Sequence, residues 1–139
     1  MLEIMFVLGV FAFLTVLASG SYILIKDNIS LKNDTYEIAN ALRGAQSLSV
    51  AAFGGVGHGV YFFADKYVTY DGNSWAEASN KSERKFTKGL SIDTLFPGFA
   101  ADVRFGRLTG TSTPSTIKVN SGNNFKTIIL RDSGKIILK

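Results

Sequence analysis

The chain opens with an uninterrupted apolar run. From Ile4 to Ile25 the sequence contains no charged residue, and Glu3 stands directly before the run. A helix of about 22 residues, at about 1.5 Å per residue, is long enough to cross the hydrocarbon core of a bilayer. The pattern therefore predicts a membrane anchor, and its expected transmembrane side chains include Ile4, Phe6, Val7, Leu8, Val10, Phe11, Phe13, Leu14, Val16 and Leu17.

The helical pattern continues past the apolar run and becomes amphipathic. Between Lys26 and Val50 there is no proline, and Gly44 is the sole glycine. Apolar residues recur at spacings of three and four, at Ile38, Ala41, Leu42, Ala45, Leu48 and Ala52. This spacing places them in one stripe of a helix. We expect one continuous helix of nearly 50 residues, with its first half in lipid, its second half packed on a domain, and local bending near residues 27–30.

A glycine cluster follows at Gly54, Gly55, Gly57 and Gly59 and predicts the end of the helix. After it the apolar pattern changes to a period of two. Residues 60–63 and 67–70 are aromatic and β-branched and predict a hairpin. Further strands are expected at 90–92, 102–105, 116–119, 125–130 and 135–138, separated by turns rich in glycine, asparagine and aspartate.

The predicted fold class is therefore α+β, with a long N-terminal helix packed on a C-terminal antiparallel β-sheet domain. Residues 1–25 form the anchor half of the helix, 26–53 its amphipathic half, and 54–139 a small β-rich domain. The domain is expected to bury aromatic side chains against the helix stripe. These are Phe62, Tyr67, Trp75, Phe86, Phe99 and Phe105.

The segment from Glu3 to Leu14 resembles the prepilin-type N-terminal segment of type IV pilins and of the pseudopilins of type II secretion. Short segments of the β region, such as Gly59-Val60-Tyr61-Phe62 and Val103-Arg104-Phe105, are similar in order to the pseudopilin domain of the minor pilin type. The resemblance implies a pilin-like fold and a filament subunit anchored by its helix. It also implies that Glu3 acts in assembly, by pairing with the N-terminal amine of a neighbouring subunit.

The family's processing signal is a short basic leader that ends in glycine and is removed by a prepilin peptidase. Only Met1 and Leu2 precede Glu3 here, so we expect either a start placed downstream of the true one or an unprocessed copy. The alternative is a secretory signal or signal anchor, since Leu17-Ala18-Ser19-Gly20-Ser21 offers small residues at a cleavage site. All 15 basic residues lie at or after Lys26, which disfavours a complete signal peptide.

The sequence offers few residues that could act in catalysis. The chain has one histidine and no cysteine, so zinc sites built from these ligands lack donors. His58, between two glycines, is expected to be an exposed turn residue. The surrounding glycines follow a helix and precede a strand, the reverse of the order in a dinucleotide-binding loop. We expect no enzyme activity, no catalytic or metal-binding residue and no cofactor.

Net charge is +4, and it gives the one hint of a ligand. Basic clusters can attract nucleic-acid phosphates or anionic lipid head groups. The candidate nucleic-acid-binding residues are Lys81, Arg84, Lys85, Lys88, Arg104, Arg107, Arg131, Lys135 and Lys139.

Three function classes remain open. The first is a minor pilin or pseudopilin, a structural subunit of a type IV pilus or of a filament similar to that of type II secretion. It would span the inner membrane once, hold its β domain outside the cytoplasm, and bind other pilin subunits and an inner-membrane assembly platform. The second is a DNA-binding minor pilin that acts in DNA uptake. The third is a signal-anchored extracytoplasmic binding domain.

Overall fold

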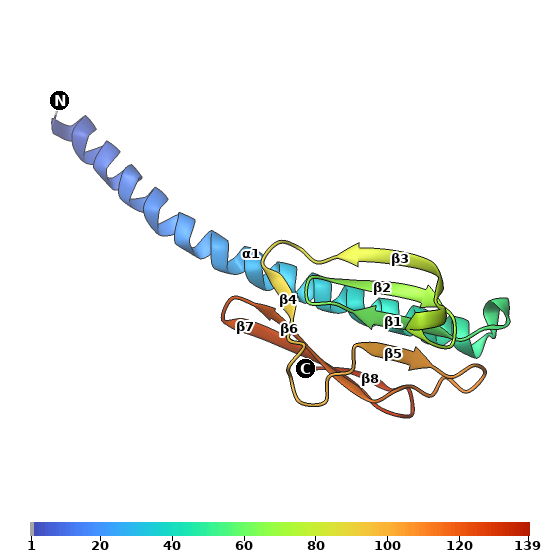
Figure 1. Ribbon diagram of the computed structural model, residues 1–139. Coiled ribbons are helices and arrows are strands. Elements are labelled where there is room, and N and C mark those ends of the chain that lie inside the picture. Colours follow the sequence, from blue (N-terminus) through green and yellow to red (C-terminus); the bar gives the residue numbers. More distant parts are fainter. Residues whose placement is uncertain (1) are drawn as a thin grey trace.

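A computed structural model describes residues 2–139 of the chain, apart from the side chains of residue 2 and of residues 17–24. The architecture is α+β, as predicted: one long helix and two antiparallel sheets (Figure 1). The elements in chain order are α1 (Leu2–Val50), the 3₁₀ helix η1 (Phe53–Gly55), β1 (His58–Phe62), β2 (Lys66–Asp71), the 3₁₀ helix η2 (Trp75–Glu77), β3 (Ser79–Lys85), β4 (Leu90–Ile92), β5 (Asp102–Phe105), β6 (Ser115–Ser121), β7 (Asn124–Leu130) and β8 (Ile136–Leu138).

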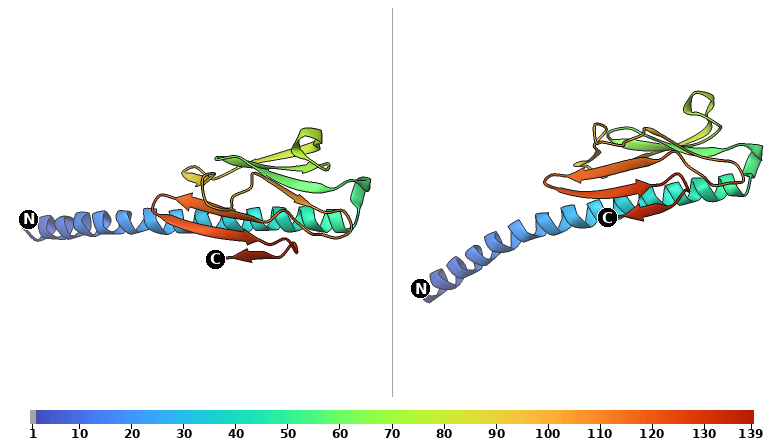
Figure 2. Two further views of the ribbon diagram at one scale, coloured as in Figure 1. Left: turned by 60° about the horizontal axis from the view of Figure 1, so that its bottom comes forward. Right: turned by 90° about the horizontal axis from the view of Figure 1, so that it is seen from below.

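Helix α1 is continuous over 49 residues, so the predicted single helix is confirmed. It curves gently along its length and has no break at residues 27–30, where the sequence had indicated a bend (Figure 2). The glycine cluster ends it as expected: Ala52 (φ 51°) and Gly54 (φ 64°) both adopt left-handed backbone conformations. The chain then reverses into β1.

The apolar run forms the first half of this helix. Leu17, one of its expected transmembrane residues, belongs to the side chains outside the description. In the described part of the chain, no helical stretch meets the length and apolarity that a membrane crossing needs.

The β region forms two sheets rather than one. The first has the strand order β3-β2-β1-β5 and the second β4-β6-β7-β8, and every pairing is antiparallel. An isolated bridge between Phe105 and Ser112 links β5 to the approach of β6. Both sheets lie along the second half of α1, while the first half projects beyond them (Figure 2).

The core lies between α1 and the inner faces of the two sheets. The helix contributes Leu31, Ile38, Leu42 and Ala45, the first sheet Val60, Phe62, Tyr67, Val103 and Phe105, and the second sheet Leu90, Ile92, Ile117, Val119, Ile128 and Leu130. The second sheet has a regular alternation, with every other residue of β6 buried. Phe86 and Phe99 are partly buried against this core. The predicted aromatic core is therefore right for these two, Phe62, Tyr67 and Phe105.

Two expectations about packing were wrong, and one strand was missed. Leu48 of the predicted stripe is exposed, and Ser49 takes the buried position in that turn of the helix. Trp75 does not face the helix, because its ring stacks on Tyr61 with centroids 4.6 Å apart. The alternation of β1 places Tyr61 on the outer face of the first sheet, opposite Val60 and Phe62. Strand β3 was not predicted, since its seven residues are all exposed and lack apolar alternation.

Two buried tyrosines of the first sheet donate hydrogen bonds to carboxylates. The Tyr67 hydroxyl donates a hydrogen bond to Glu37 Oε1 on α1 at 3.1 Å. The Tyr70 hydroxyl donates to Asp102 Oδ1 on β5, and its ring lies over Gly59, where a Cβ atom would stand 2.5 Å from it. Burial, together with Glu37, raises the pKa of Tyr67 above its ordinary value of 10.0. Burial, together with Asp102, raises the pKa of Tyr70 in the same direction.

Substitution of the fully buried Leu42 by alanine is expected to lower the free energy of unfolding by about 2–5 kcal/mol, because it leaves a cavity between α1 and both sheets. The exposed Leu14→Ala variant is the matched control and should change stability by less than about 0.5 kcal/mol. Urea unfolding of the full chain in detergent, followed by circular dichroism, measures both. Equal losses for the two variants would contradict the packing.

The two tyrosines predict a loss of stability in alkali. Both phenols stay protonated in the folded state at a pH where unfolded tyrosine ionises, so the unfolded chain binds fewer protons above pH 10 and stability falls as pH rises. The stabilising contribution is fully present below pH 10. Denaturant unfolding between pH 8 and pH 12 should show this fall, and a Tyr67→Phe/Tyr70→Phe double variant should flatten it. An unchanged slope in that variant would contradict the assignment.

Candidate assembly surface

The first half of α1 forms an apolar arm, defined here as residues 3–27. Among its described side chains, the large apolar ones from Ile4 to Val16 are 44% to 75% exposed. The first described helix side chain tied to a sheet is Asn28, whose Oδ1 accepts a hydrogen bond from Asn124 Nδ2 at 2.9 Å. Leu31 is the first described helix residue that is buried. Among the described side chains, contacts between the helix and the sheets therefore begin at Asn28. The first half of α1 projects from the sheets (Figure 1).

The exposed apolar area of the arm is unusual for a domain with a well-formed core. Soluble monomers rarely expose contiguous apolar patches larger than a few hundred Å². Covering a large apolar side chain is worth about 1.5–3 kcal/mol when burial is complete. The ten large apolar residues concerned are Ile4, Met5, Phe6, Val7, Leu8, Val10, Phe11, Phe13, Leu14 and Val16. A surface of this kind favours association with lipid or with other apolar helices.

Glu3 lies at the tip of the arm, in the first turn of α1. There its carboxylate has a favourable interaction with the helix dipole. It shares a shallow surface hollow with Ile4, Val7 and Leu8. The described residues provide no salt-bridge partner for it.

The candidate nucleic-acid-binding residues do not form one surface. Lys81, Arg84 and Lys85 lie on β3, with Lys88 just after it, while Arg104 and Arg107 lie on and after β5. These strands are the two opposite edges of the first sheet. Arg131, Lys135 and Lys139 lie around β8 of the second sheet. Residues that are neighbours along the chain stay together, and the sheet order separates the resulting groups from one another.

Arg104 and Arg107 are the one pair of predicted basic neighbours that share a cleft. They line an open polar hollow with Thr111, Ser112 and Thr113. The Arg104 guanidinium is partly engaged, because it donates to the Asn73 carbonyl at 3.1 Å and lies 3.6 Å from Asp102. This hollow holds too few free cations to follow a nucleic-acid backbone.

His58 is the clearest correction to the sequence analysis. It was expected to be an exposed turn residue, and it is only 3% exposed as the first residue of β1. Its Nδ1 lies 2.7 Å from Asp71 Oδ1, and its Nε2 lies 3.1 Å from the Phe53 carbonyl oxygen. Both partners are acceptors, so a ring with a proton on each nitrogen satisfies both. His58 joins the end of the helix to the first sheet.

Ser49 completes this join through the backbone. The His58 N–H donates to Ser49 Oγ at 2.9 Å, so the serine contacts the main chain of His58 and not its imidazole. The arrangement therefore lacks the hydroxyl-to-imidazole contact of a nucleophilic triad. Sequence reasoning missed Asp71 because the pairing of β1 with β2 brings it to His58, and it missed Ser49 because the chain reversal after α1 brings the last turn of the helix to β1. Within the described residues, no three acidic, histidine or cysteine side chains gather at metal-binding distance.

No protein-family model, curated protein or solved structure matches the chain. The interpretation of the arm therefore depends on its geometry and on the sequence pattern.

Replacing His58 with alanine is expected to lower the free energy of unfolding by about 1–3 kcal/mol, because the buried imidazole contacts to Asp71 Oδ1 and to the Phe53 carbonyl oxygen are lost. The exposed Arg107→Ala variant is the control and should change it by less than about 0.5 kcal/mol. Urea denaturation measures both. If His58→Ala is no more destabilising than Arg107→Ala, the contacts of the His58 imidazole do not stabilise the packing of the first sheet on the end of the helix.

Proposed function

We propose that this protein is a structural subunit that assembles laterally through the arm of α1, in the manner of a minor pilin or pseudopilin. The observation that carries the proposal is the exposed arm. Its described large apolar side chains are exposed, while the second half of the same helix packs against two sheets. The second half of the helix is therefore covered by its own domain. In the proposal, lipid or neighbouring subunits cover the first half.

The mechanism is packing. In the proposal the arm lies in the inner membrane before assembly, with the β domain on the extracytoplasmic side. During assembly the arm exchanges lipid contacts for the arms of neighbouring subunits in a periplasmic or surface filament. Close helix packing in lipid depends on small side chains and on polar partners rather than on the hydrophobic effect. Gly9 supports such an approach, because without a side chain it lets the backbone of a neighbouring helix come close.

Glu3 would set the axial position of the subunit. A carboxylate in an apolar surrounding is costly unless a cation pairs with it. In the proposal a neighbouring subunit supplies that cation through its N-terminal amine. Removing one member of a buried ion pair costs about 3–5 kcal/mol because the other charge remains unpaired. The proposal thus gives Glu3 a role that the fold of the single chain does not require.

The resemblance of the N-terminal segment and of the β region to minor pseudopilins supports the same role. The partners expected with it are other pilin subunits, the inner-membrane assembly platform and, where a leader is encoded, a prepilin peptidase. DNA binding has less support, because the candidate basic residues are divided among separate sheet edges.

A Glu3→Ala variant tests the proposal. We expect its incorporation into filaments or large membrane complexes to fall at least about tenfold, since the unpaired neighbouring cation costs about 3–5 kcal/mol. Its β domain should unfold at the wild-type denaturant concentration, because Glu3 lies on the arm and far from the core. Both are measured in the native host, by fractionation with quantitative immunoblotting and by urea unfolding of the purified chain.

The matched control is Glu77→Ala, which removes an exposed glutamate on η2 of the β domain. It should incorporate at the wild-type level. Wild-type incorporation of Glu3→Ala, or an equal loss in both variants, would contradict the role assigned to Glu3.

A further inference from the structure

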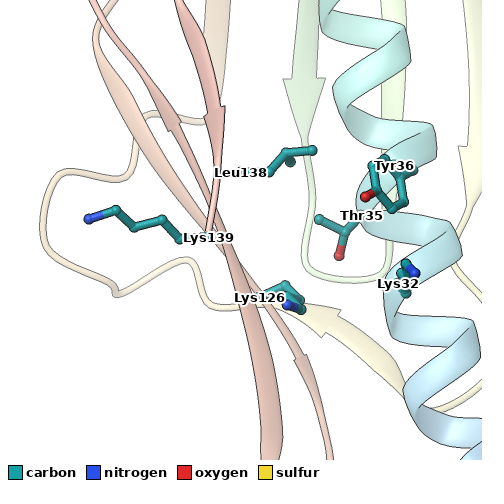
Figure 3. Close-up of a pocket in the computed structure, with 6 residues that line it drawn as sticks. All are labelled: Lys32, Thr35, Tyr36, Lys126, Leu138 and Lys139. Carbon is teal, nitrogen blue, oxygen red and sulfur yellow. The ribbon is translucent and has the colours of Figure 1, made fainter.

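A pocket with a cationic rim lies between α1 and the last two strands, just above the base of the arm. It is partly open to solvent and is lined by Lys32, Thr35 and Tyr36 of α1, Lys126 of β7, Leu138 of β8 and Lys139 (Figure 3). Thr35 is buried and Leu138 half-buried, so they form an apolar floor. In Figure 3 the Lys139 side chain extends away from the helix, which leaves Lys32 and Lys126 as the inner cations.

The two inner lysines have no acidic partner in the described part of the chain. Neither is among its salt bridges or side-chain hydrogen bonds, and both are exposed. The acids of this part of α1 lie on other sides of the helix. Asp34 accepts hydrogen bonds from Thr87, and Glu37 accepts one from Tyr67. Neither Thr87 nor Tyr67 belongs to the second sheet, which carries Lys126. Asp27 is five residues before Lys32, about 140° around a helix of 3.6 residues per turn.

The position of the pocket along the helix suggests what its cations meet. Lys32 is seven residues after Ile25, the last residue of the apolar run, and so about 10 Å further along the axis. The head-group layer of a bilayer is about 5–8 Å thick on each side, and a lysine stem can reach back toward it. The hydrogen bond between Asn124 and Asn28 holds the start of β7, and with it Lys126, at the level of the arm's base.

We propose that Lys32 and Lys126 bind the phosphate of an anionic phospholipid head group. This inference rests on the proposed function, since it places the arm in a bilayer. The phosphate lies between the two ammonium groups, and the apolar floor at Leu138 faces the glycerol part of the lipid. Two inner cations are too few to follow a nucleic-acid backbone. The bound lipid orients the β domain on the membrane before assembly.

The test uses the full chain in a zwitterionic detergent micelle. It is titrated separately with dihexanoyl phosphatidylglycerol, dihexanoyl phosphatidylcholine and inorganic phosphate, and the amide NMR shifts of Thr35 and Leu138 report binding. We expect saturable shifts with phosphatidylglycerol and at least about tenfold weaker binding of phosphatidylcholine. Inorganic phosphate should also bind at least about tenfold more weakly, because it makes no contact with the apolar floor.

A Lys32→Gln/Lys126→Gln double variant should bind phosphatidylglycerol about 25-fold more weakly, at about fivefold for each lysine beside an anionic group. The control is Lys81→Gln/Lys85→Gln on β3, which removes the same charge at a distant edge and should bind as the wild type does. Equal weakening in both pairs would show a diffuse charge effect and overturn the site. Equal binding of inorganic phosphate and phosphatidylglycerol would overturn the lipid as the ligand.

One further measurement separates this inference from the proposed function. Insertion of the wild-type chain into pure phosphatidylcholine vesicles depends on the arm and not on the lysines. If the chain inserts into phosphatidylcholine vesicles but shows no preference for phosphatidylglycerol in the titration, the lipid site is overturned and the proposed assembly role is not affected. Failure to insert into any vesicle overturns both.

Discussion

The structure depends on one helix that serves two environments. From Leu31 onward, α1 supplies one wall of the core, and Ile38 and Leu42 are fully buried between the two sheets. Before Asn28 the same helix has no such cover among its described side chains, although its apolar content is higher there. The sheets cannot extend over the arm, because the turn between β6 and β7 meets the helix at Asn28 and ends there. The domain therefore leaves the described side chains of the arm exposed.

Polar contacts as well as packing hold the second half of α1 against the sheets. Asp34 accepts hydrogen bonds from the Thr87 backbone N–H and hydroxyl, and Gln46 donates to the carbonyl oxygens of Gly110 and Gly134. Gly134 leaves space for that amide, since a Cβ there would overlap it. These contacts tie both sheets to one side of α1 and fix its rotation.

The sequence was sufficient where one local pattern decided the structure. The uninterrupted helical pattern and the glycine cluster located α1 and its end, and the apolar alternation located β1, β2 and β6. It failed where tertiary pairing decided. Strand β3 has no apolar face, and it forms because β2 offers it a free edge. His58 sits between glycines that suggest a turn, and it becomes buried because the register of β1 with β2 places it opposite Asp71.

The central claim is that the arm is covered by other subunits, and a single cysteine tests it directly because the chain has none of its own. Leu8→Cys places a thiol on the arm, and Leu95→Cys places one on the most exposed loop leucine of the domain as a reference. The account predicts that, in intact cells, Leu8→Cys is protected from a water-soluble maleimide and forms cross-links to another subunit when an apolar bis-maleimide is added. Reaction of Leu8→Cys with the water-soluble reagent as fast as Leu95→Cys, without cross-links, would contradict it.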